Sequence, residues 1–268
     1  MGMPAMGVVG AGLGTLIARI VELFVLLVLT VYIKSPVKIE LARLFKIDKS
    51  LIKTFMQKGY GLVANEFFWA FGIQSLTVIY TMRISENIAV MSIAQTFAKL
   101  IWVGIGGMSV VFSIYLGEHL GKNEFELAKS VAKKLKVLGA VIGISLGITV
   151  LIISFFLMSF FDVTAEILTT GKIILIITVG FSWLNYLNSS YYFILRSGGD
   201  TKGVLLIDSL FTWVVMIPAA FLVGRFGFVL PLHFFIVQFF EFGKLILAHK
   251  LYLKGKWLNN LTVLPNTN

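Results

Sequence analysis

Long, uninterrupted apolar runs constrain most strongly what this chain can fold into. Two of them read LFVLLVLTVYI (residues 23–33) and VLIISFFLMSFF (residues 150–161). A bilayer core about 30 Å thick needs roughly 20 helical residues to cross it. The apolar/polar alternation of a membrane β-strand is absent, and lipid offers no partner for open backbone groups. We therefore predict an all-α, polytopic transmembrane bundle of about seven helices, which cover approximately 8–32, 59–82, 88–115, 136–160, 172–195, 203–224 and 228–249.

Composition excludes a water-soluble domain. Hydrophobic residues make up 58% of the 268 residues and charged residues only 13%, and the mean hydropathy is +0.92. Soluble domains carry roughly a quarter charged residues. The chain has no cysteine, its three histidines show no metal-ligand spacing, and it lacks the GxxxxGK[ST] motif of ATP-driven proteins. We therefore expect no enzyme chemistry, no metal and no cofactor.

Basic residues gather in alternate connections between the apolar stretches. Eighteen of the 23 Lys and Arg lie in four segments, against three in the other connections; the four are 33–58, 117–136, 196–202 and the tail from 244. The positive-inside rule predicts that these segments and the C-terminus are cytoplasmic, with the N-terminus outside. The net charge of +10 is then a topology signal that also favours anionic lipid headgroups. We expect a multi-pass protein of the plasma or inner membrane and no nucleic-acid partner.

The longest connection divides the chain. Residues 33–58 separate a lone transmembrane helix, 1–32, from a unit of six helices, 59–250, which is followed by a cytoplasmic tail, 251–268. Within the unit, Gly139, Gly143 and Gly147 form two overlapping GxxxG repeats. Such repeats are typical of close helix packing in membranes.

Five segments carry more than hydrophobicity and charge. They are GVVGAGLGTLIARIVEL (7–23), NEFFWAFG (65–72), YLGEHLGKNEFELAK (115–129), FILRSGGDTKG (193–203) and LLIDSLFTWVVMIPAAFLVG (205–224). Together and in this order they resemble the MATE family of multidrug and toxic compound extrusion transporters. The resemblance covers nearly the whole chain.

The resemblance implies half of a two-lobed fold. The family has two six-helix lobes related by pseudo-symmetry, and residues 7–23 match the last helix of its N-terminal lobe. Residues 33–58 then look like the inter-lobe linker and 59–250 like the C-terminal lobe. Five helices of the family have no counterpart here, so we expect a truncated chain that lacks an N-terminal lobe.

The resemblance also implies a function. Family members are secondary antiporters that export drugs and organic cations in exchange for H⁺ or Na⁺, with cationic amphipathic substrates in a cavity between the lobes. Alternating access would rock one lobe against the other. Two alternatives stay open: a transport-inactive fragment of such a transporter, and a lipid-linked saccharide flippase of the same superfamily.

Polar residues at membrane depth are the candidate site, because ionisable groups there are costly and are often functional. Glu66 looks like the acidic residue of the family's C-lobe, although it lies about one turn earlier than in the cation-binding branch, and its neighbour Asn65 is a further candidate. Asn185 takes the place where that branch carries an aspartate, so its amide can bind a cation but cannot release a proton. Asn188 lies nearly one turn further along and is a further candidate. Lys99, near the midplane of its span, is expected to face the cavity.

These residues also have structural interpretations. Hydrogen bonding between helices would explain Glu66 equally well and is slightly favoured for Asn188. Asp208, close to the cytoplasmic end of its span, and Pro218, which interrupts the helix, are expected to be structural. So is the turn formed by Arg196, Gly198, Gly199 and Asp200, a helix stop followed by an N-cap. Finally, Glu241 and Lys244, three residues apart, are expected to neutralise each other.

Overall fold

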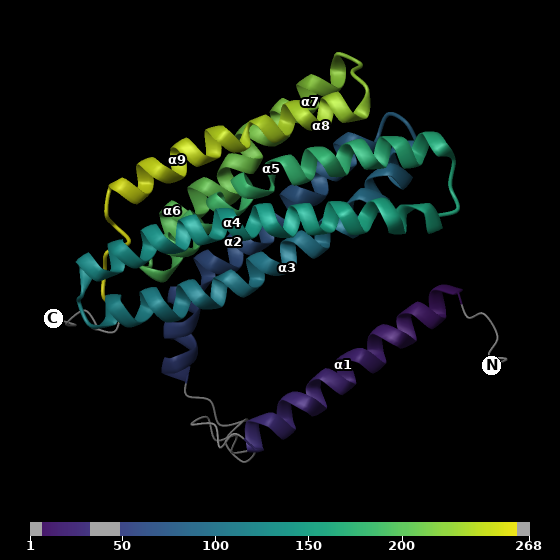
Figure 1. The fold of residues 1–268 in the computed structure, drawn as a ribbon. Helices are drawn as coiled ribbons and strands as arrows, with labels where there is room; N and C mark the ends of the chain where they lie inside the picture. The colour runs from purple at the N-terminus through teal and green to yellow at the C-terminus, as the bar shows by residue number, and fades with distance from the viewer. Residues whose placement is uncertain (1–6, 33–48, 262–268) are drawn as a thin grey trace. The chain divides into compact units, whose positions relative to one another are not determined.

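The computed structural model describes residues 7–32 and 49–261 (Figure 1). The chain forms two compact units, Met1–Lys58 and Gly59–Asn268, and each is described by itself. Of the expected linker 33–58, residues 33–48 lie outside the described part of the chain. Every described segment of regular structure is helical, which confirms the all-α prediction.

The first unit contains helix α1, Gly7–Tyr32. Its residues Gly12–Thr30 form a stretch long and apolar enough to cross a membrane. Its two charged residues neutralise each other, with Arg19 Nη1 at 2.6 Å from Glu22 Oε2. The lone helix predicted over 8–32 is therefore present.

The second unit contains six further segments that are long and apolar enough to span a membrane, the first of which, Tyr60–Thr81, belongs to a helix that begins at Lys49 in the first unit. The first four are single long helices: α2 (Lys49–Thr81), α3 (Glu86–Gly121), α4 (Phe125–Leu157) and α5 (Ala165–Ser197). The last two are interrupted. The sixth span comprises α6 (Thr201–Leu205), the π-helical turns η3 (Leu206–Leu210) and η4 (Thr212–Met216), and α7 (Ile217–Arg225). The seventh comprises α8 (Leu230–Phe239) and α9 (Glu241–Leu253), which meet at Phe240.

The connection predicted over 117–136 is much shorter than expected. Helix α3 continues through Gly117 to Gly121, and α4 begins at Phe125. The residues between 125 and 136 form an amphipathic helix, because Ala128 and Ala132 are fully buried while most of the lysines between and beyond them are exposed. The segment that we expected to be a loop therefore forms the end of α3 and the start of α4, and the two helices make a hairpin with a short turn.

Helices α3, α4 and α5 pack side by side and form the main core (Figure 1). The predicted glycine face on α4 is buried at this contact. A Cβ atom on Gly143 would lie 2.8 Å from the Tyr186 ring of α5, and Gly147 meets Ser182 as closely. The Ser182 hydroxyl donates to the Gly143 carbonyl at 2.9 Å. The GxxxG repeats are therefore a packing surface, as predicted.

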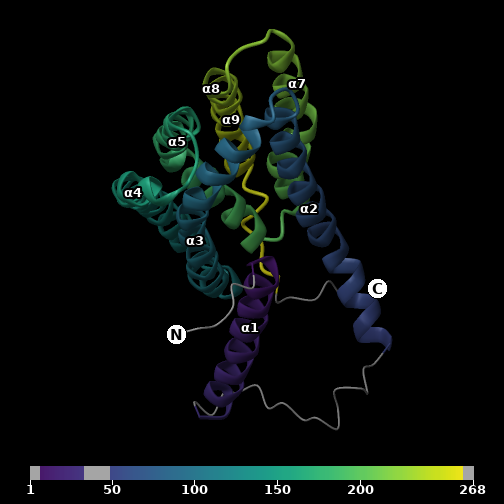
Figure 2. The same cartoon turned by 90° about the vertical axis from the view of Figure 1, so that its right-hand side faces the viewer.

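The sixth span lies beside α2 (Figure 2). Trp213 Nε1 donates to the Phe68 carbonyl at 2.9 Å, and the Phe71 ring stacks on the indole at 5.6 Å. The hydrogen-bonding pattern departs from that of an α-helix over the two π-helical turns and returns to it at Ile217, next to Pro218. Turns of this kind occur often at functional sites, because they re-aim the side chains they carry.

The C-terminal segment packs against the ends of α3 and α5. Trp257 is 1% exposed, and its carbonyl approaches Gly198 so closely that a Cβ atom there would lie 1.7 Å from it. Gly199 adopts φ +77°, a conformation favoured by glycine. The Asp200 carboxylate accepts a hydrogen bond from Gly203 N at 3.0 Å. As predicted, the turn ends one helix at Gly198 and caps the next with Asp200. The sequence did not indicate the contact between Gly198 and Trp257.

Candidate functional site

The six-helix unit contains a cavity of about 520 Å³. It lies among α2, α3, α5 and the two interrupted spans, and most of its lining is apolar. Its charged lining residues are Glu66, Arg196, Asp208, Glu241 and Lys244, and its polar lining residues include Gln95, Asn185, Asn188 and Tyr192. An apolar chamber with a few convergent charged groups is typical of a small-molecule site.

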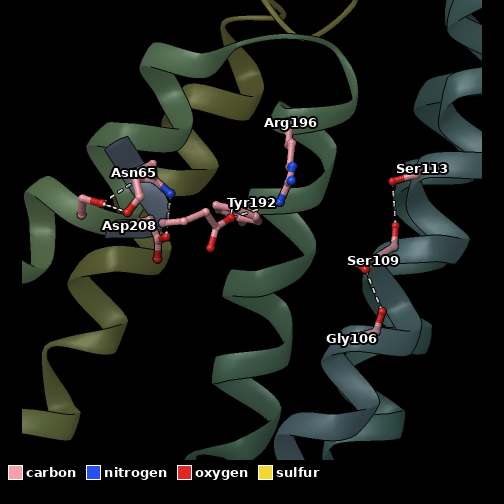
Figure 3. Close-up of polar contacts among 9 residues, drawn as sticks. Asn65, Gly106, Ser109, Ser113, Tyr192, Arg196 and Asp208 are labelled. Atoms are coloured by element: carbon pink, nitrogen blue, oxygen red, sulfur yellow. Dashed lines mark hydrogen bonds and ion pairs between the residues drawn. The ribbon is translucent and has the colours of Figure 1, made fainter. Parts of the chain in front are cut away.

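Glu66 on α2 is held by two side chains from α5, Tyr192 and Arg196, which lie near each other in Figure 3. The Tyr192 hydroxyl donates to Glu66 Oε1 at 2.9 Å, and Arg196 Nη1 lies 3.3 Å from the same oxygen. Arg196 also donates to the Tyr192 hydroxyl at 3.2 Å. The Glu66 and Arg196 side chains are 52% and 44% exposed, so this ion pair remains open to an incoming ion or ligand.

Asn65, the neighbour of Glu66 on α2, is buried, with 1% of its surface exposed. Its Nδ2 donates to Asp208 Oδ2 at 3.1 Å, and its Oδ1 accepts from the Ser209 hydroxyl at 2.7 Å. Asp208 and Ser209 both belong to the π-helical turn η3. This buried contact joins α2 to the irregular part of the sixth span (Figure 3).

Lys244 on α9 lies between two carboxylates. Its Nζ is 3.6 Å from Asp208 Oδ1 and 4.0 Å from Glu241 Oε2. The predicted pairing of Glu241 with Lys244 is therefore present, and Asp208 joins it. Asn188 Nδ2 on α5 donates to Glu241 Oε2 at 2.8 Å and to the Glu241 carbonyl at 3.1 Å.

The structure brings most of the predicted site residues together. Glu66, Asn185 and Asn188 line the cavity, and Asn65 lies directly behind its wall. Lys99 does not join them. It is exposed on α3 and is absent from the cavity lining, although its neighbour Ala98 lines it. The position of a residue along a helix does not give the direction of its side chain, so the expectation that Lys99 faces the cavity was wrong.

Two residues predicted as structural also belong to the cavity. Arg196 pairs with Glu66, and Asp208 is 13% exposed on its side chain rather than open to water. Asp208 is enclosed because η3 carries it toward α2 and α9. Tyr192 was missed, although its i,i+4 spacing from Arg196 places both on one helix face.

The α3 wall adds small hydroxyl groups. Ser109 donates to the Gly106 carbonyl at 2.7 Å, and Ser113 to the Ser109 carbonyl at 2.8 Å (Figure 3). Gly106 and Ser109 line the cavity. The hydroxyl groups of Ser109 and Ser113 donate to carbonyls of their own helix, so they offer little unmet hydrogen-bonding capacity to a ligand.

The described residues form seven helices long and apolar enough to cross a membrane, and five of these spans line a partly charged cavity; the chain is therefore a multi-pass helical membrane protein. The family model MatE matches residues 63–222, more than half of the chain. The chain therefore belongs to the MATE family of multidrug and toxic compound extrusion transporters.

The curated relatives that match this chain are distant in sequence. The probable multidrug resistance protein YoeA of Bacillus subtilis is 24% identical over 84% of this chain and 49% of its own length. The uncharacterised transporter YisQ of the same organism is 23% identical over 83% of this chain and 49% of its own length. The probable multidrug resistance protein NorM of Pasteurella multocida is 22% identical over 86% of this chain and 50% of its own length. The chain thus spans about half the length of the curated relatives it matches, and no solved structure matches it.

Proposed function

We propose that this chain forms the C-terminal half of a secondary antiporter that exports drugs or other organic cations in exchange for H⁺ or Na⁺. Family membership and the names of the multidrug-resistance relatives support this proposal. The observation that carries it is the Glu66 carboxylate, which faces a largely apolar cavity and is neutralised there by Arg196.

Ion coupling follows from that pairing. Binding of H⁺ or Na⁺ to Glu66 would remove its negative charge, so Arg196 and Tyr192 would lose their acceptor. Asn185, on the same cavity wall, could offer a carbonyl oxygen to Na⁺. The ion and the cationic substrate would then compete for one carboxylate, which is the simplest form of antiport coupling. No cofactor is needed besides the coupling ion.

Orientation and partners belong to the same proposal. The basic connections and the C-terminus would face the cytoplasm, with the N-terminus outside. A multi-pass membrane protein contacts lipids along its apolar surface. A partner lobe, encoded in the same or another chain, would complete the substrate cavity on the side that the family's N-terminal lobe occupies.

Dye efflux from cells tests the proposed function. We would express the chain in cells that lack their own efflux pumps and measure accumulation of a cationic amphipathic dye. The proposal expects lower accumulation with the chain and no effect with Glu66→Gln. Glu118→Gln, which alters an exposed carboxylate paired with Lys122 at 2.6 Å, is the matched control and should behave like the unmodified chain.

A failure of the chain alone would support the inactive-fragment alternative, provided that a version with a full N-terminal lobe restores efflux. If dye efflux is absent in both versions, the drug-export proposal is wrong. Movement of a lipid-linked saccharide between leaflets would then be the measurement that favours the flippase alternative.

A further inference from the structure

Four lysines lie close together at the start of α4, outside the cavity; they are Lys129, Lys133, Lys134 and Lys136. Because successive residues of a helix turn by about 100°, Lys129, Lys133 and Lys136 share one face, and Lys134 lies on another. The shared face meets α9, since the Lys136 ammonium group lies 3.9 Å from the centre of the Tyr252 ring. Lys133 and Lys136, one helical turn apart on this face, are called the α4 lysine pair below.

Aromatic rings hold Lys136 in place. Its Nζ also lies 4.6 Å from the centre of the Tyr191 ring and donates to the Tyr191 hydroxyl at 3.4 Å. Both rings are fixed in turn. Tyr191 bonds to His249 Nδ1 at 2.9 Å, and Tyr252 stacks at 5.3 Å on Trp257, which is buried. Ring faces attract a cation but do not neutralise it, so a full positive charge is held at a defined position.

The α4 lysine pair has no carboxylate partner among the residues that the structure describes. The acidic residues at this end of α3 and α4 are already bound to other side chains; they are Glu118, Glu124 and Glu126, paired with Lys122, His119 and Lys129. Two like charges one turn apart on a helix repel each other. An anion that bridges Lys133 and Lys136 would remove that repulsion.

The position of the α4 lysine pair along its helix matches the level of phospholipid headgroups. Residues 137–157 of α4 carry no charge, and about 1.5 Å per residue gives this stretch roughly the 30 Å thickness of a bilayer core. Lys136 immediately precedes the stretch, and Lys133 lies one turn further out. Tyr252 and Trp257 beside them are the aromatic types enriched where a membrane meets water. A lipid phosphate can therefore reach both ammonium groups while its acyl chains stay among apolar side chains.

We propose that the α4 lysine pair binds the phosphate group of an anionic phospholipid, with its acyl chains along α4 and α9. Basic pockets between transmembrane helices suit such headgroups. A zwitterionic headgroup brings its own cation close to Lys133 and Lys136 and so loses much of the attraction. The site goes beyond the proposed function, because lipid binding here depends neither on transport nor on the coupling ion.

The test is native mass spectrometry of the full chain purified in detergent, titrated with dioleoylphosphatidylglycerol against equimolar dioleoylphosphatidylcholine. The unmodified chain should retain phosphatidylglycerol in preference. Lys133→Met and Lys136→Met should each weaken its binding by about fivefold or more, because each removes one charge from the phosphate. Lys136→Arg keeps the charge and can stack on the same rings, so it should bind phosphatidylglycerol as the unmodified chain does. Lys133 is exposed, so Lys133→Met remains a valid test if Lys136→Met does not fold.

Lys134→Met is the matched control. It removes the same charge from an exposed position next to Lys133 but from another face of α4, and it should leave phosphatidylglycerol binding unchanged. A second arm distinguishes a lipid from a soluble phosphate compound. Inorganic phosphate in tenfold molar excess over the lipid should not displace it, because the acyl chains contribute to lipid binding. Displacement would show that the ligand is a soluble phosphate and that the lipid proposal is wrong.

Three results would overturn the proposal. One is equal retention of phosphatidylglycerol and phosphatidylcholine by the unmodified chain. Another is unchanged binding in both Lys133→Met and Lys136→Met. The third is an equal loss in Lys134→Met, which would mean that overall charge rather than a site attracts the lipid. Each can occur whether dye export succeeds or fails, so failure of this inference and failure of the proposed function are distinguishable.

Discussion

At the residue scale, each carboxylate in the cavity is held by a side chain from another span. Glu66 of α2 meets Arg196 of α5, Asp208 of η3 meets Lys244 of α9, and Glu241 of α9 meets Asn188 of α5. Only the pairing of Glu241 with Lys244, three residues apart, could be predicted from the sequence. Pairing between residues on different helices depends on how each helix is rotated about its axis. The spacing of residues within one helix does not give this rotation.

Asn65 joins α2 to the sixth span through hydrogen bonds with Asp208 and Ser209. Asn65→Ala should lower the free energy of unfolding by about 1–3 kcal/mol, because Asp208 and Ser209 would lose buried partners. Ser75→Ala on the same helix removes a hydroxyl that bonds only to the Phe71 carbonyl of its own helix and is exposed, so it should have little effect. Denaturation in detergent micelles measures the free energy of unfolding of both variants. Equal stabilities of Asn65→Ala and Ser75→Ala would contradict this prediction.

Gly198 gives a second prediction at this scale. Gly198→Ala should destabilise the protein by about 1–3 kcal/mol, because the new Cβ atom would overlap the Trp257 carbonyl and displace the tail. Gly117→Ala is the control, since nothing lies within 4 Å of a Cβ atom there, and alanine favours helix. Thermal unfolding monitored by circular dichroism would separate them. A Gly198→Ala protein as stable as the control would show that the tail contact is unimportant.

At the element scale, the apolar runs predicted all seven spans, and the GxxxG repeats predicted the α4 packing face. The helix ends were less predictable. The lysines between 129 and 136 suggested a loop, whereas Ala128 and Ala132 pack into the core and continue α4 toward Phe125. The π-helical turns were not anticipated either, because Pro218 marks the place where the helix is disturbed but not the form that the disturbance takes.

The α4–α5 contact yields a prediction for these two elements. Gly143→Ala should cost about 1–3 kcal/mol of stability, because the Cβ atom would press on the backbone-proximal part of the Tyr186 side chain, which cannot move away easily. Gly180→Ala on α5 has nothing within 4 Å of the new atom and should be neutral or slightly stabilising. Unfolding in mixed micelles gives the comparison. A neutral Gly143→Ala would mean that the two helices are not packed this closely.

At the scale of the whole molecule, the distribution of Lys and Arg predicts an orientation that can be measured directly. The chain has no cysteine, so a single introduced cysteine reports its own location. Lys256→Cys, in the exposed part of the tail, should react with a membrane-impermeant maleimide only after the cells are permeabilised. Phe226→Cys, 76% exposed between the sixth and seventh spans, should react in intact cells. The reverse pattern would refute the proposed orientation.

The central claim for the whole molecule is that the cavity couples export to an ion through Glu66. Proteoliposomes containing the chain, loaded with a cationic dye and given an imposed Na⁺ or pH gradient, test it most directly. The account predicts dye movement that depends on one of the two gradients and falls about tenfold or more in Glu66→Gln, but not in Glu118→Gln. Dye movement that ignores both gradients, or that is equally fast in Glu66→Gln, would contradict the account.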